Sequence, residues 1–188
     1  KKESTRKKVS RSSNITPKEV AEHGKIQPQA VDLEEAVLGA MMLEKDAVSA
    51  VIDILSPAVF YKESHKKIMA AISSLFSKSE PVDILTVTNE LKSTGDLEMV
   101  GGPYYITMLT SRIASTANVE YHARIILQKH IQRELIRISS EIIKDAFEDT
   151  TDVFDLLDRA EQNLFSVSES NLRTNFEDMP SLVKQAIL

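Results

Sequence analysis

The sequence predicts an all-α protein with a compact multi-helix head, followed by a long helical hairpin and the start of a linker helix. Only five glycines and six prolines occur in 188 residues, so few positions interrupt a helix. Apolar residues recur with the 3-and-4 spacing of amphipathic helices, whereas the alternating patterns of strands are scarce. We therefore expect a basic arm over residues 1–27, the head over 28–117, the hairpin over 118–168, and the linker with its helix over 169–188.

The amino-terminal arm differs from the rest of the chain in charge. Residues 1–11 carry a net charge of +5, and the whole chain carries −5, so the remaining residues carry −10. The arm lacks periodic apolar residues, which predicts a disordered, solvated tail. A nucleic-acid tether is the alternative, because phosphate contacts depend on lysine and arginine, which the acidic body offers poorly.

The head begins with two short apolar helices within residues 33–55, which we expect to meet near residues 44–46. Asp32 and Glu35 have the spacing of a capping box at the start of the first helix. Pro57 is expected to stop the second helix, because proline disfavours the helical conformation in the residue before it.

Two further helices have clear boundaries. The first is expected over residues 63–77, with an apolar face formed by Ile68, Met69, Ile72, Leu75 and Phe76. Asp83 should cap the second, with Val82 and Val87 as a hydrophobic staple. Gly95 should end that helix in the left-handed conformation.

One more helix is expected in the head before the hairpin. Pro103 suits the first position of a helix, where no amide hydrogen is needed. The apolar residues of this helix are Tyr104, Tyr105, Ile106, Met108 and Leu109. A polar joint over residues 114–117 then leads to the hairpin.

The hairpin is predicted from a stretch without glycine or proline. A helix from Val119 to Phe147 would be roughly 43 Å long, at about 1.5 Å per residue. A shorter helix follows from Val153, capped by Thr151 or Asp152. The apolar stripe of the long helix is wider than one partner helix can cover, so we interpret the hairpin as an assembly element. The residues favoured for self-association are Ile131, Leu135, Ile138, Leu157 and Leu164, although some of these must form the hairpin's own core.

After the hairpin, residues 170–175 are polar and predict a linker. Another amphipathic helix begins at Pro180, with Leu182, Val183 and Ile187 on one side. The sequence ends after barely two turns of this helix, which is marginal alone. We therefore expect the natural chain to continue.

The sequence shows no pattern for catalysis, cofactor binding or metal binding. No G-x-x-x-x-G-K phosphate loop and no G-x-G turn occur, and no two histidines have the i, i+4 spacing of a helical zinc site. His65 follows two aromatic residues and is interpreted as a packing residue with satisfied hydrogen bonds. The chain lacks cysteine and any eighteen-residue apolar window, which fits a cytoplasmic protein without a membrane span.

Eight segments occur together in a fixed order. They are PQ (28–29), EEAVLGAMML (34–43), LSPAVFYKESHKKI (55–68), EPVDILTVTNEL (80–91), GGPYYITML (101–109), ANVEYHARII (117–126), RELI (133–136) and DRAEQNLF (158–165). This pattern resembles the amino-terminal domain of DnaB-type replicative DNA helicases.

The resemblance implies an assembly role in bacterial DNA replication. In the family, hairpins pair between subunits, and three pairs form a collar above a hexameric motor ring. The motor domain, which uses ATP and Mg²⁺ and unwinds DNA, would follow residue 188, so this segment itself is expected to be non-catalytic. Leu182, Val183 and Ile187 would dock on the motor domain of a neighbouring subunit.

The resemblance also implies a primase-docking surface on the collar. The positions that correspond to primase contacts are Asp32, Tyr105, Ile136 and Ile142, and each of them has capping or core packing as its alternative role. A free-standing helical adaptor that dimerises through its hairpin is the second interpretation of the whole chain.

Overall fold

The computed structural model describes residues 26–111, 116–148 and 150–172. These parts of the chain are all-helical, which confirms the predicted fold class. The elements are α2 (Val31–Leu43), α3 (Lys45–Val51), the 3₁₀ helix η1 (Pro57–Val59), α4 (Glu63–Ser77), α5 (Ile84–Ser93), α6 (Gly102–Ser111), α7 (Val119–Ala146) and α8 (Val153–Leu172). The predictions for residues 1–25 of the basic arm, for residues 114–115 of the joint and for the linker helix lie outside the described residues.

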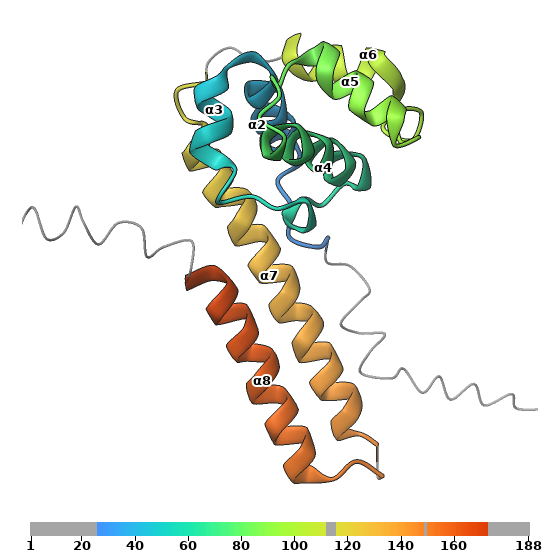
Figure 1. The fold of residues 1–188 in the computed structure, drawn as a ribbon. Helices are drawn as coiled ribbons and strands as arrows, with labels where there is room; N and C mark the ends of the chain where they lie inside the picture. Colours follow the sequence, from blue (N-terminus) through green and yellow to red (C-terminus); the bar gives the residue numbers. More distant parts are fainter. Residues whose placement is uncertain (1–25, 112–115, 149, 173–188) are drawn as a thin grey trace, which may run out of the picture.

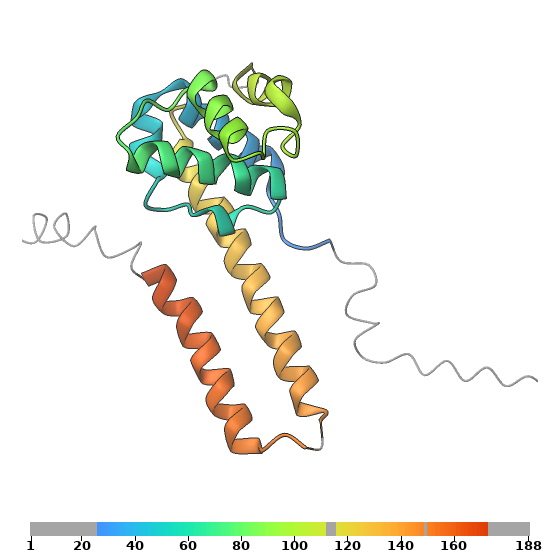
Figure 2. The same ribbon diagram turned by 45° about the vertical axis from the view of Figure 1, so that its right-hand side comes forward.

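Helices α2 to α6 form the head, and α7 runs out of it to form the first arm of the hairpin (Figure 1). The same separation is visible after a 45° turn (Figure 2). The first two turns of α7 belong to the head, because Val119, Ala123 and Ile126 join its buried apolar cluster. α8 packs antiparallel along the remainder of α7. The start of α7, which extends beyond the end of α8, is therefore covered by the head of the same chain.

Several helix ends follow the predicted local chemistry. α4 has the predicted bounds, and the Asp83 carboxylate accepts hydrogen bonds from the amides of Leu85 and Thr86 at 2.8 and 2.9 Å. The Thr86 hydroxyl in turn accepts from the Asp83 amide, which completes a capping box at α5. Gly95, with φ of +79°, follows the carboxyl end of α5 in the left-handed conformation that glycine adopts without strain.

Other expectations about the head were wrong. α2 begins after Ala30 without a side-chain cap, so Asp32 lies inside the first turn and is exposed. α3 ends at Val51, well before Pro57. Phe76 and Tyr104 are 43% and 81% exposed, because each points away from the cluster that its helix helps to form.

The second arm of the hairpin is longer than predicted. α8 continues to Leu172, so the expected polar linker is wrong for residues 170–172. Asp152 caps this helix through the amides of Phe154 and Asp155, as one of the two predicted alternatives.

Candidate protein–protein interface and the buried network behind it

The hairpin exposes many large apolar side chains, which we call the hairpin apolar surface. Its members are Leu135, Ile136, Ile143 and Phe147 near or on α7, with Val153, Phe154, Leu157, Leu164 and Phe165 on α8. The spacing of Ile136, Ile143 and Phe147 places these three on one face of α7. Phe154 and Phe165 share a face of α8 and are 77% and 68% exposed. Clustered exposed apolar side chains are typical of protein association sites, which makes this surface the candidate interface.

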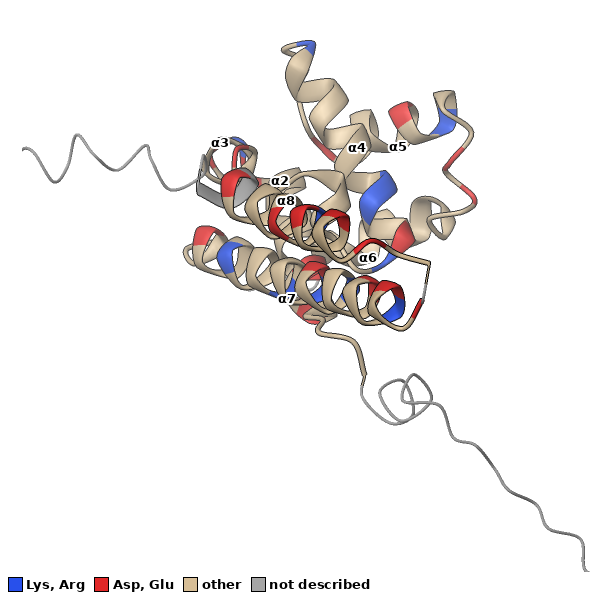
Figure 3. Cartoon of the chain, turned by 90° about the horizontal axis from the view of Figure 1, so that it is seen from below, with Lys and Arg blue, Asp and Glu red and all other residues tan. Residues whose placement is uncertain are grey.

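The charges of the two arms differ in sign pattern (Figure 3). On α7, Arg137 pairs with Glu134 and Glu141 at 2.9 and 2.8 Å, so neighbouring charges on this helix neutralise one another. On α8, Arg159 is the one cationic side chain, and all other charged side chains are acidic. Screened surface pairs of this kind contribute little to stability. Apolar burial therefore supplies the principal attraction available on this surface.

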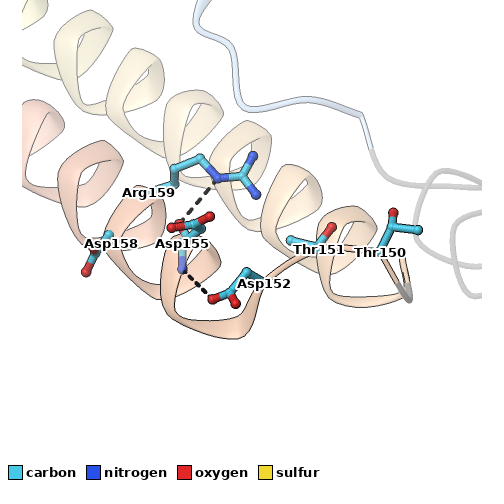
Figure 4. Close-up of a pocket in the computed structure, with 6 residues that line it drawn as sticks. All are labelled: Thr150, Thr151, Asp152, Asp155, Asp158 and Arg159. Atoms are coloured by element: carbon cyan, nitrogen blue, oxygen red, sulfur yellow. Dashed lines mark hydrogen bonds between the residues drawn. The ribbon is translucent and has the colours of Figure 1, made fainter.

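The tip of the hairpin contains a hollow of about 420 Å³, lined by Thr150, Thr151, Asp152, Asp155, Asp158 and Arg159 (Figure 4). Arg159 bridges the two arms through Asp145, with 3.1 Å between Nη1 and Oδ2. The Asp152 carboxylate is occupied as the cap of α8. The polar groups here close the hairpin, and the described residues contain no cluster that could hold a metal ion.

A buried polar network lies inside the head. His65 Nδ1 is 2.6 Å from Glu34 Oε2, and His65 Nε2 is 2.7 Å from the Tyr105 hydroxyl. The Tyr61 amide donates to Glu34 Oε1 at 2.7 Å. Glu34 and His65 are 1% and 0% exposed, so these bonds replace the water that both groups lose on folding. The prediction that His65 is a packing residue with satisfied hydrogen bonds is confirmed.

Arg133 joins the head to the hairpin. Its Nη1 donates to the Pro28 carbonyl at 2.8 Å, and its Nη2 donates to the Val59 carbonyl at 2.6 Å. The guanidinium carbon lies 5.6 Å from the centre of the Tyr61 ring, within cation–π range. Nearby on α7, burial and the Arg133 charge lower the pKa of the half-buried His130.

The four predicted primase-contacting residues do not share one environment. Asp32 is exposed on α2, whereas Tyr105 is half-buried and bonded into the network. On α7, Ile136 is 49% exposed, and Ile142 is half-buried. Two of these residues therefore belong to the head and two to the hairpin.

The predicted self-association residues divide between surface and core. Leu135, Leu157 and Leu164 are exposed, and Ile131 is half-buried. Ile138 is 1% exposed, which matches the expectation that some of the five residues form the hairpin's own core. Leu182, Val183 and Ile187 lie outside the described residues.

The sequence pattern indicated neither Glu34 nor Arg133. Glu34 occurs in the acidic first turn of a helix, where a carboxylate ordinarily stabilises the dipole from the solvent side. Arg133 follows the mixed charge pattern of an exposed helix face. Both residues acquire their partners from segments that are distant in the sequence, and no local spacing signals such contacts.

The sequence and the fold of this chain match those of known proteins. The family model for the DnaB-like helicase N terminal domain matches residues 26–128, which comprise the head and the beginning of α7. The chain belongs to this family. The crystal structure of the N-terminal domain of DnaB helicase from Mycobacterium tuberculosis has a TM-score of 0.70 and 32% identity, over 75% of this chain and 99% of that one. A DnaB-like replicative helicase, described with its interactions with primase, has a TM-score of 0.61 at 22% identity and supports the fold alone.

Replicative helicases are similar to the chain in sequence. The chain is 44% identical to the DnaB of Rhodothermus marinus over 164 residues, which are 87% of this chain and 17% of the relative. It is 37% identical to the replicative DNA helicase DnaC of Bacillus subtilis, over 86% of this chain and 36% of the relative. The chain thus spans only 17% and 36% of the lengths of these two relatives. None of its described helices is long and apolar enough to cross a membrane.

Proposed function

We propose that this chain is the assembly domain of a bacterial replicative DNA helicase, which joins copies of the protein through the hairpin and docks primase. The observation that supports this most strongly is the hairpin apolar surface in a chain of the DnaB N-terminal family. The surface has no cover within the described residues, and none of its members belongs to the buried cluster of the head.

Pairing of two hairpins would bury this surface. A twofold contact places the same patch of each copy against the other, so one chain can supply both halves of the interface. Leu135, Leu157 and Leu164 are the residues we assign to this contact, with Ile131 at its edge. In the hexameric parent protein, three such dimers would form the collar.

Primase docking is proposed for Asp32 and Tyr105 on the head and for Ile136 and Ile142 on the hairpin. Ile136 is the strongest of the four, because half of its large apolar side chain faces solvent on a helix. A structural neighbour of the same fold is described with its interactions with primase, which supports this choice of partner.

The motor activity is assigned to the parent protein. ATP, Mg²⁺ and DNA would bind to a domain beyond residue 188, in the bacterial cytoplasm, and this segment would contribute assembly rather than catalysis. The supporting observation is that the relatives are replicative DNA helicases of which this chain matches only a part. A G-x-x-x-x-G-K-[ST] phosphate loop encoded downstream would test this assignment.

Binding of the matching primase to Ile136→Asp and Ile142→Asp tests the docking surface. We expect each variant to bind primase more weakly, because a carboxylate in an apolar contact must lose its hydration. Sedimentation of each variant alone would separate a loss of docking from a loss of self-association. Gln128→Asp is the control, since it places the same charge at an exposed polar position of α7. Wild-type primase affinity in both isoleucine variants would reject the proposed docking residues.

A further inference from the structure

An unbroken series of polar contacts crosses the head from α6 to α2. It begins at the Tyr105 hydroxyl, which lies 2.7 Å from His65 Nε2 on α4. The other ring nitrogen of His65 lies 2.6 Å from the carboxylate of Glu34 on α2. Three helices are thus linked by one buried and one partly buried contact, with the imidazole in the middle. Tyr105 is half-buried, and Lys62 Nζ lies 5.8 Å from the centre of its ring.

The series continues from Glu34 to the hairpin. Glu34 Oε1 accepts the Tyr61 amide at 2.7 Å, which fixes the backbone between η1 and α4. Arg133 holds the same short segment from the other side, through the Val59 carbonyl and the Tyr61 ring. Because Arg133 lies on α7, the segment from Val59 to Tyr61 contacts both Glu34 on α2 and the hairpin.

Burial makes this series sensitive to the loss of a single member. An unpaired polar group that remains buried keeps its full desolvation cost, which is larger than the net gain from an average hydrogen bond. No buried side-chain nitrogen or oxygen in the described part of the chain lacks a partner. Removing one contact therefore forces its neighbours to move toward a new partner or toward water.

We propose that the Tyr105–His65–Glu34–Tyr61–Arg133 series couples the head surface at Tyr105 to the angle at which the hairpin leaves the head. A protein partner that captures the Tyr105 hydroxyl withdraws one contact from His65. The resulting shift of Glu34 then weakens its hydrogen bond to the Tyr61 amide, in the segment that Arg133 contacts. The coupling is a property of this chain and does not depend on whether that partner is primase.

The absence of cysteine permits a direct measurement of the angle. Ser93→Cys on the head and Lys144→Cys near the far end of α7 replace exposed residues and would carry two spin labels. Labelled chains are mixed with an excess of unlabelled chains, so that the distance distribution reports the separation within one molecule. Circular dichroism of each variant verifies that the head remains folded.

Tyr105→Phe removes only the hydroxyl at one end of the series. We expect it to shift or broaden the distance distribution, as Arg133→Met does at the other end. The double variant should show no larger change than Arg133→Met alone, because both substitutions interrupt one series. Glu34→Gln weakens the series at its middle member, because glutamine has nearly the same shape as glutamate but no charge. Tyr104→Phe is the matched control, because the side chain of Tyr104 is 81% exposed.

The control should retain the wild-type distribution. Tyr105→Phe and Glu34→Gln could both keep the wild-type distribution while Arg133→Met changes it. Arg133 would then stabilise only its own contacts, and the proposed coupling would be wrong. Additive changes from Tyr105→Phe and Arg133→Met would also overturn it, because independent sites produce independent effects.

Discussion

The head covers its apolar residues with its own helices, whereas the hairpin leaves most of its apolar residues on the surface. In the head, five helices and the start of α7 enclose one apolar cluster. Beyond Ile126, Ile138 is the one fully buried hydrophobic residue that the structure describes. Two helices packed side by side can bury only one stripe each, while several crossing layers can enclose a core. We therefore expect the head to fold by itself and the hairpin to bury its apolar residues against a second protein surface.

The largest expected difference between the two regions comes from a pair of phenylalanine truncations. Phe60 is 1% exposed in the head, and Phe165 is 68% exposed on α8. Phe60→Ala should lower the free energy of unfolding by about 3–5 kcal/mol, because it leaves a cavity. Phe165→Ala should change it by less than about 0.5 kcal/mol, as expected at an exposed site. Urea unfolding of dilute protein measures both values.

Phe165→Ala should instead weaken self-association, which sedimentation at higher concentration detects. Equal losses of folding stability for the two variants would contradict the separation between a self-sufficient head and a dependent hairpin.

A smaller difference is expected from the two aspartate caps. Asp83 and Asp152 each accept two backbone amides at the start of a helix. Asp83→Ala should lower the unfolding free energy of the head by about 1 kcal/mol. Asp152→Ala should fray the start of α8 and accelerate amide hydrogen exchange there, while the exchange in the head stays unchanged. Faster exchange throughout the molecule for Asp152→Ala would show that the two regions fold as one unit.

The sequence predicted elements that depend on local chemistry. The bounds of α4, the Asp83 capping box and the left-handed Gly95 all follow from residues within a few positions of one another. The expected capping box at Asp32 failed, because Glu35 is instead 3.5 Å from Lys62 and 3.3 Å from the Tyr105 hydroxyl. A tertiary partner thus replaced the local one.

The candidate interface was also predicted only in part, because some of its features depend on tertiary contacts. The width of the apolar stripe indicated an interaction surface on the hairpin, but it did not separate buried Ile138 from exposed Leu135. That distinction depends on the rotation of α7 relative to α8 and to the head. The contacts of Glu34 and Arg133 bridge 27 to 105 positions of sequence, and periodicity within one helix carries no information about them.

The smallest expected effect concerns pH at the junction of the two regions. Burial and the charge of Arg133 lower the pKa of His130 in the folded chain. The unfolded chain binds this proton near pH 6.5, so below that pH the unfolded state holds more protons and folding stability falls. His130→Gln should therefore lose less stability than the wild type when the pH drops from about 7 to about 5.5. Parallel losses in both proteins would show that His130 does not contribute.

Sedimentation across a range of concentrations tests the dependence of the hairpin on a second copy most directly. The wild type should sediment as a dimer or larger species at micromolar concentration, and a Leu157→Asp/Leu164→Asp variant should sediment as a 21.0 kDa monomer with unchanged helicity. A wild-type chain that remains a 21.0 kDa monomer at every concentration would contradict the assignment of the hairpin apolar surface to self-association.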